Sequence, residues 1–254
     1  MRNRLHVLVA ACIMATPLLP TAPAASAALR DPEAWYQGCM GLADSDPGRA
    51  LEQAEARRAA GGGTPAGHCA AVALVRLGRL EEGAKRFEAL AGEASRADLR
   101  AGLLDQAAGA WLLQGSADKA LVLLDKAIGI APFDAGLRID RAAALADLGR
   151  YQDAVGELDR AVALEPSSAD AYAFRASAQR RLNREDAALA DLERALSLQP
   201  QHPEALLERG ILRQLRGNRS GARADWETLV AAAPRSAAAD SARANLDALA
   251  QRRK

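Results

Sequence analysis

Apolar residues recur along this chain with a helical period and, over its second half, with a longer period of 34 residues. Residues 140–150 (DRAAALADLGR) align with 174–184 (FRASAQRRLNR), and 158–166 (LDRAVALEP) align with 192–200 (LERALSLQP). No segment shows the period-two alternation of a half-buried strand. The pattern therefore predicts an all-α chain built from internal repeats.

Within each repeat, the same positions carry the same kind of side chain, and each kind suits a pair of closely packed helices. Small residues at the eighth and twentieth positions let two helices cross closely, and a large apolar residue at the twenty-fourth fills the space between them. The eighth, twentieth and twenty-fourth positions are, in turn, Ala108, Ala142, Ala176, Gly210; Ala120, Ala154, Ala188, Ala222; and Leu124, Leu158, Leu192, Trp226.

Turn residues mark the ends of these predicted helices. Proline lacks the backbone donor and clashes with the preceding turn, so we expect the second helix of each repeat to end before it. Glycine, or asparagine in one repeat, tolerates the positive φ of a turn between two helices. The prolines are Pro132, Pro166, Pro200 and Pro234, spaced 34 residues apart, and the turn residues are Gly115, Gly149, Asn183 and Gly217.

This period and these positions resemble the tetratricopeptide repeat (TPR) family. The resemblance implies an all-α, right-handed superhelical solenoid of antiparallel helix pairs with a C-terminal capping helix. The expected units are a signal peptide (1–27), a degenerate N-terminal helical pair (28–63), a degenerate repeat (64–100), four repeats (101–134, 135–168, 169–202, 203–236) and a capping helix (237–254).

The family resemblance also implies a site, because the first helices of TPR units line a concave groove that holds a peptide or protein. The corresponding groove residues here are Val72, Arg76, Asp105, Leu112, Ile139, Asp147, Ser177, Arg180, Arg181, Leu207 and Ile211. The Lys, Asn and Arg set with which some members clamp a peptide C-terminus is missing. We expect apolar anchors on the partner and an acidic group near Arg180 and Arg181; an ordinary solvated helix end is the alternative for these arginines.

A second periodic pattern pairs basic with acidic residues. Arginine recurs at the seventh position and a carboxylate at the twenty-third, which an antiparallel hairpin brings back beside it. The predicted pairs are Arg141 with Glu157, Arg175 with Asp191, and Arg209 with Asp225. As exposed pairs, each is expected to contribute only about 0–1 kcal/mol and to set register more than stability.

The first 27 residues have the pattern of an export signal. Arg2 and Arg4 precede an apolar stretch, and Ala25-Ser26-Ala27 offers a small-x-small cleavage site after Ala27. The stretch is too short and too interrupted by proline for a comfortable membrane span, although an uncleaved anchor is an alternative. A second alternative is a lipobox ending at Cys12, which would tether the protein to a membrane. We expect a periplasmic or secreted protein with no membrane span after cleavage.

Export would leave two cysteines, Cys39 and Cys69, in an oxidising compartment. Thiols there form disulfides, and the repeat alignment places these two on neighbouring helices, so we predict a Cys39–Cys69 bridge. The alternative is a pair of small buried apolar side chains.

Composition excludes several function classes. Lys plus Arg is 33 against 32 for Asp plus Glu, and no basic stripe of the kind that binds nucleic acid is present. No phosphate-binding loop, nucleophile elbow or zinc spacing occurs, so no catalytic residue, cofactor or metal site is expected. The sequence predicts a non-catalytic scaffold or adaptor that binds an unidentified protein or peptide. A lipid-anchored envelope assembly component and a self-associating structural protein are the alternatives.

Overall fold

The computed structural model describes residues 31–251, which form thirteen α-helices and contain no β-strand. The helices are α2 (Pro32–Ser45), α3 (Pro47–Ala59), α4 (Gly63–Arg76), α5 (Leu80–Glu93), α6 (Ala97–Leu113), α7 (Ala117–Ile130), α8 (Ala135–Asp147), α9 (Tyr151–Leu164), α10 (Ala169–Arg181), α11 (Glu185–Leu198), α12 (Pro203–Leu215), α13 (Arg219–Ala232) and α14 (Ala237–Gln251). None of these helices is long and apolar enough to cross a membrane.

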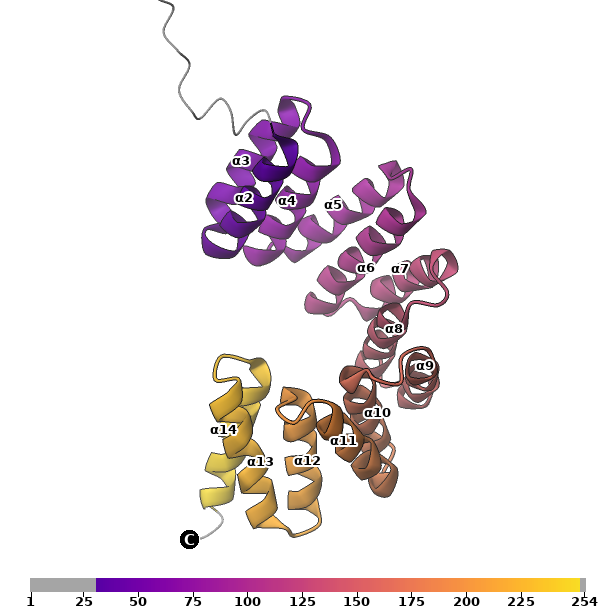
Figure 1. The fold of residues 1–254 in the computed structure, drawn as a ribbon, viewed down its shortest axis with the longest axis vertical. Coiled ribbons are helices and arrows are strands. Elements are labelled where there is room, and N and C mark those ends of the chain that lie inside the picture. The colour runs from indigo at the N-terminus through magenta and orange to yellow at the C-terminus, as the bar shows by residue number, and fades with distance from the viewer. Residues whose placement is uncertain (1–30, 252–254) are drawn as a thin grey trace, which may run out of the picture.

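The helices pack as successive antiparallel pairs in an all-α solenoid. Each helix contacts its neighbours in the chain, and α6, α8, α10, α12 and α14 also contact one another in that order. The chain curves around an open hollow, with α2–α5 on one side and α12–α14 on the other (Figure 1). The fold expected from the 34-residue period is confirmed.

Local chemistry at the helix ends follows the sequence pattern. The second helix of each of the four repeats (α7, α9, α11 and α13) ends two residues before the proline of that repeat. For example, α7 ends at Ile130, and the proline is Pro132. The turn between the two helices of a repeat requires a left-handed residue, with φ of 72° at Gly149 and 60° at Asn183. Asparagine is among the few side chains that tolerate this conformation, so the repeat keeps its turn without glycine.

The core consists of alanine and leucine side chains where the two helices of a repeat cross. Ala142 and Ala176 are 1% exposed, and Leu158 and Leu192 pack beside them with exposures of 1% and 0%. In the last repeat, Gly210 takes the place of this alanine and Trp226 takes the place of this leucine. A Cβ at Gly210 would lie 2.2 Å from the Nε1 atom of Trp226, so the larger indole requires the smaller residue.

The predicted arginine–carboxylate pairs all form. The N–O distances are 3.0 Å for Arg141 with Glu157, 2.7 Å for Arg175 with Asp191 and 2.7 Å for Arg209 with Asp225. The expectation that they are exposed is wrong, because the three carboxylates are buried, with exposures of 3–7%. They lie on the inner side of the second helix, facing the hairpin.

Two of these arginines also join successive repeats. Arg141 reaches Asp125 of the preceding repeat at 2.8 Å, and Arg175 reaches Asp159 at 2.8 Å. Each guanidinium thus lies between a buried carboxylate of its own repeat and an exposed one of the repeat before. A guanidinium that bridges two carboxylates has its orientation fixed by charge-assisted hydrogen bonds, and it links the two repeats.

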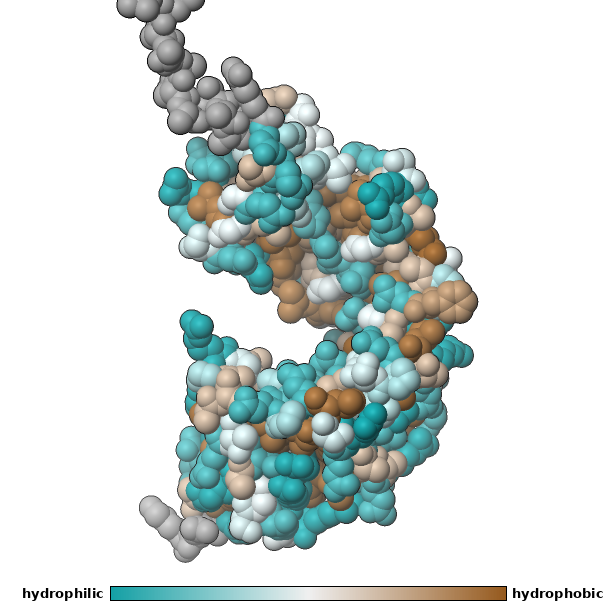
Figure 2. All heavy atoms as spheres, viewed as in Figure 1, coloured by the Kyte–Doolittle hydropathy of each residue, from teal (hydrophilic) through white to brown (hydrophobic). Residues whose placement is uncertain are grey.

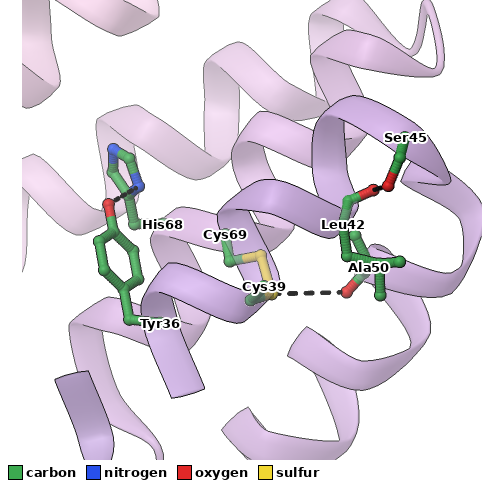
Figure 3. The surroundings of a disulfide bond; sticks show 7 residues. All are labelled: Tyr36, Cys39, Leu42, Ser45, Ala50, His68 and Cys69. Atoms are coloured by element: carbon green, nitrogen blue, oxygen red, sulfur yellow. Dashed lines mark hydrogen bonds between the residues drawn. A yellow bond between two sulfur atoms is a disulfide. The ribbon is translucent and has the colours of Figure 1, made fainter. Parts of the chain in front are cut away.

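A disulfide links the first helical pair to the next helix. Cys39 of α2 and Cys69 of α4 are bonded, with 6.2 Å between their Cα atoms, and both are buried (Figure 3). Alanines from α3 and α4 surround the bridge. Because the apolar cluster here consists mainly of alanine side chains, the covalent link holds a weakly packed end of the solenoid.

The expected signal peptide, its cleavage site after Ala27 and the alternative lipid attachment at Cys12 lie outside the described residues. One difference from the repeat period lies inside them. The first helix expected to begin at residue 101 begins at Ala97, so an insertion after α5 gives α6 a length of 17 residues against 13 for α8.

Candidate functional site

The first helices of the repeats, α4, α6, α8, α10 and α12, carry all the residues predicted to bind a partner. We call the surface formed by the predicted residues and their neighbours on these helices the concave groove. Figure 2 shows a hollow in the molecule with apolar surface along the side formed by the α4–α6 part of the chain. No ligand is needed to form this surface, because the helices that carry it pack on their own second helices.

Apolar side chains in the groove fall into two groups. Val72, Leu112, Leu207 and Ile211 are half-buried, since they pack on the core with one side and leave the other accessible. Ile139 is half-buried in the same way. Leu113 and Leu215, at the last turns of α6 and α12, are 69% and 63% exposed. Large aliphatic side chains with this exposure are the groups that a partner's apolar residues would cover.

The arginines of the groove already have partners within the chain. Arg180 Nε lies 2.6 Å from Glu208, which also accepts a hydrogen bond from Ser177 at 3.0 Å. Arg181 donates to the Tyr151 hydroxyl at 2.6 Å and covers its ring. Arg76 pairs with Asp44 at 2.9 Å. An acidic partner group would have to compete with these contacts.

Two carboxyl groups in the groove lack such a partner. Asp105 of α6 and Asp140 of α8 share a hydrogen bond, and no cation contributes to the environment of either one. Burial, followed by repulsion from Asp140, raises the pKa of Asp105 to about 7. Burial also raises the pKa of Asp140. The pair therefore holds a shared proton near neutral pH, and a cation that displaced it would gain two charged ligands.

A small cavity of about 60 Å³ lies between α8 and α10. Ala143 and Ala146 of α8 line it with Phe174 and Arg181 of α10, and Tyr151 closes one side. The volume suits one small apolar side chain. Phe174 is 37% exposed at this place, so the cavity has an aromatic wall.

The structure adds groove residues that the sequence interpretation missed, and they share one repeat position. In three repeats the residue at the sixth repeat position reaches back to the preceding first helix: Gln106 accepts a hydrogen bond from His68 at 2.7 Å, Asp140 meets Asp105, and Glu208 meets Arg180. Phe174 occupies the same position. The sixth repeat position carries a different residue type in every repeat, so the repeat pattern did not identify it as a contact position.

Two histidines are held by polar contacts between neighbouring first helices. Tyr36 donates to Nδ1 of His68 at 2.9 Å (Figure 3), and burial lowers the pKa of His68. His202 caps α12 by accepting from the Ala205 amide, and its Nε2 lies 2.9 Å from Asp170. Each ring accepts a hydrogen bond at Nδ1 and turns Nε2 toward a neighbouring first helix. Among residues 31–251, no group of three His, Cys, Asp or Glu side chains is placed to hold a metal.

Comparison with known proteins agrees with this architecture. Two sequence profiles described as tetratricopeptide repeat match residues 112–178 and 175–247. No curated protein matches the chain in sequence.

Solved structures share the fold. A thermophilic TPR protein of Thermus thermophilus is 22% identical and superposes with a TM-score of 0.61 over 71% of this chain and 95% of its own. MamA of Desulfovibrio magneticus RS-1 is 19% identical, with a TM-score of 0.53 over 64% of this chain and 90% of its own. The two profiles, which together match residues 112–247 and so more than half of the chain, show that it belongs to the tetratricopeptide repeat family.

Proposed function

We propose that this protein is a non-catalytic scaffold or adaptor of the bacterial periplasm, and that its concave groove holds a peptide or a segment of another protein. Repeats of this family support a protein–protein interaction scaffold. The observation that carries the proposal is the exposure of Leu113 and Leu215, which lie on the first helices α6 and α12. Exposed aliphatic side chains on a preformed concave surface favour binding of a chain with apolar anchors.

The charges of the groove favour a basic group on the partner. The sequence suggested an acidic partner group, but Arg180 is neutralised by Glu208, whereas Asp105 and Asp140 face each other without a cation. A lysine or arginine placed between these two carboxyl groups would replace their repulsion with two charge-assisted contacts. We therefore expect a partner segment with one cationic residue near the middle and apolar residues on either side.

The cavity between α8 and α10 supplies a place for one of those apolar residues. Its volume of about 60 Å³ and its alanine walls fit a side chain no larger than valine or proline. It lies one repeat along from Asp105, so a partner that reached both would cross two successive first helices.

Placement in the periplasm rests on the export signal expected in residues 1–27 and on the Cys39–Cys69 bridge. Structural disulfides persist in oxidising compartments and are rare in the cytosol. N-terminal sequencing of the exported protein tests this part: the account expects a start at Ala28. A mature chain that begins with a lipid-modified Cys12 would support the envelope-anchored alternative.

The binding proposal is tested by crosslinking and affinity capture from the native cell envelope. A Leu113→Asp, Leu215→Asp variant places two charges in the groove at positions where folding does not require burial. Phe133→Asp is the matched control, since Phe133 is 83% exposed in the turn between α7 and α8. We expect a specific protein with the native chain and the control, and its loss with the double variant. Recovery of only this chain would favour the self-associating alternative.

A further inference from the structure

A second groove lies between α5 and α7, and its residues are separate from those of the concave groove. Two cavities, about 370 Å³ and 450 Å³, lie end to end and share Glu88, Leu123 and Lys126. A third, about 340 Å³, continues along the start of α5 and shares Lys85 with the first. Together they follow α5 along its length, with α6 between the two walls (Figure 1). We call this surface the α5–α7 groove.

The floor of the α5–α7 groove is apolar and fixed. Trp111 of α6 is 3% exposed, and its indole N–H donates to Glu88 at 2.8 Å. Leu104 and Leu123 extend the floor, and Val122 on the rim is 55% exposed. Gly92 leaves the α5 wall open, because a Cβ there would meet no atom within 4 Å. The apolar surface that a partner side chain can reach is therefore chiefly Val122, which lies beside a buried apolar floor.

The rim of the α5–α7 groove is basic. The chain has four lysines, and the three among residues 31–251, Lys85, Lys119 and Lys126, all lie on this rim. Arg100, from the additional first turn of α6, joins them. Everywhere else along the described chain the basic residues are arginines. The three lysines among the described residues are thus gathered on one surface.

Most carboxylates of the α5–α7 groove are neutralised by ion pairs, whereas two of its lysines have no ion pair among the described residues. Lys85 pairs with Glu81 at 2.6 Å, and Arg79 pairs with Glu82 at 2.6 Å. Lys119 lies 3.7 Å above the Trp111 ring. In residues 31–251 neither Lys119 nor Lys126 has a carboxylate within ion-pair distance. Arg100 donates to the Ala94 carbonyl. Glu88 is the remaining acid, so the groove keeps an excess of positive charge.

We propose that the α5–α7 groove is a second docking site and that it takes an acidic peptide segment of a partner protein. Two carboxylates of that segment meet Lys119 and Lys126, and an apolar side chain lies against Val122 on the rim. Lysine is a mobile point charge and does not require the fixed fork geometry of arginine. The site therefore recognises two negative charges at a suitable spacing together with an apolar group. A partner bound in the concave groove would leave this surface accessible.

The spacing of the lysines argues for an extended acidic segment and against a single phosphate group. Lys119 and Lys126 are seven residues apart on α7, which is about 10 Å along a helix. One phosphate cannot contact two ammonium groups whose helical positions are separated in this way without drawing both stems together. An extended peptide advances about 3.3 Å per residue and turns alternate side chains to opposite faces. Carboxylates two or four residues apart therefore share a face and lie about 7 or 13 Å apart, distances that mobile lysine side chains about 10 Å apart can meet.

The proposal is tested by selecting short random peptides displayed on phage against the native protein, and then measuring the fluorescence anisotropy of the selected peptides. The test variant is Lys119→Glu, Lys126→Glu. The control is Arg49→Glu, Arg235→Glu, which makes the same change in net charge at two exposed residues far from the groove in sequence. Circular dichroism establishes that all three proteins are folded.

We expect one selected class to combine Asp or Glu with a large apolar residue, and its affinity to fall at least about tenfold with the lysine variant but about twofold or less with the control. Leu113→Asp, Leu215→Asp is expected to leave this class bound, which separates the result from the concave groove. The proposal fails if no acidic class is selected, or if it binds the lysine variant as tightly as the native protein. Sedimentation showing a native dimer that the lysine variant loses would assign the groove to a second copy and also overturn it.

Discussion

The two aspartates in the concave groove make its electrostatics depend on pH. The pKa of Asp105 is raised to about 7, far above the value of an aspartate in an unfolded chain, so the folded protein holds a proton that the unfolded chain releases. The protonated pair contributes stability that is fully present below pH 4 and is lost as pH rises through about 7.

Asp105→Asn is therefore expected to raise stability at pH 8 by about 1–2 kcal/mol, a value reduced for the partial solvation of the carboxyl. At pH 4 the difference from the native protein should vanish, since both then carry a neutral side chain. Urea unfolding at the two pH values measures this. Asp147→Asn, an exposed residue of the same groove, is the control, and an equal effect of both variants at pH 8 would contradict the account.

The arginine pairs give a second test at the residue scale. Arg175 contacts buried Asp191 and, across the repeat boundary, Asp159. Arg175→Met leaves Asp191 without its cation, and we expect a loss of about 2–4 kcal/mol. Arg150→Met removes an exposed pair with Asp153 and should cost less than about 1 kcal/mol. Chemical denaturation measures both, and equal losses would show that burial of the carboxylate is unimportant.

Sequence reasoning predicted these pairs but not their environment. The spacing of sixteen residues fixes which side chains meet across a hairpin, because helix length and turn are constant. It carries no information on whether the acid faces solvent or the hairpin. The contact of Asp105 with Asp140 escaped prediction for a related reason, since it joins two repeats at a position whose residue type changes in each one.

At the scale of helix pairs, Gly210 and Trp226 exchange the usual packing of alanine against leucine for glycine against tryptophan. Gly210→Ala forces its methyl group against the indole, and we expect a loss of about 1–3 kcal/mol. Adding Trp226→Leu restores the combination found in the three preceding repeats. A double-mutant cycle should then show a favourable coupling of at least about 1 kcal/mol. Additive losses would mean that the two residues do not share this space.

The Cys39–Cys69 bridge holds the first helical pair, α2 and α3, against α4. A closed loop with a sequence separation of 30 is expected to stabilise by about 3–4 kcal/mol if the effect is entropic. In the Cys39→Ser, Cys69→Ser variant, amide exchange should become fast in α2 and α3 while α8–α13 stay protected. Loss of protection along the whole chain would show that the solenoid unfolds as one unit.

The helices could be predicted because the same pattern of small, large apolar and turn residues occurs in four repeats. Comparing the four repeats identifies the positions that they share. The first units departed from that pattern in ways only the structure resolves. The additional turn of α6 begins at Ala97, where no proline marks a boundary, and it brings Arg100 to the α5–α7 groove. The break in the period before Ala101 indicates an insertion, but periodicity does not predict that these residues lengthen a helix, because the other repeats have no equivalent.

For the whole molecule, the structure combines a curved stack of first helices with two grooves of different charge. The concave groove has the exposed Leu113 and Leu215 and a hydrogen-bonded pair of aspartates, whereas the α5–α7 groove has lysines along its rim. A scaffold that presents two such surfaces can hold two segments of opposite charge at once. The arrangement suits bringing partners together, and it depends on a rigid solenoid to keep the two surfaces at a fixed separation.

The central claim is that the concave groove holds another polypeptide, and site-specific photocrosslinking in living cells tests it most directly. A photoreactive residue replaces Leu113 or Leu215 in the groove, or Phe133 in the α7–α8 turn as the control. We expect one protein other than this chain to be crosslinked from both groove positions and not from position 133. Failure to crosslink from either groove position, or the same products from all three, would contradict it.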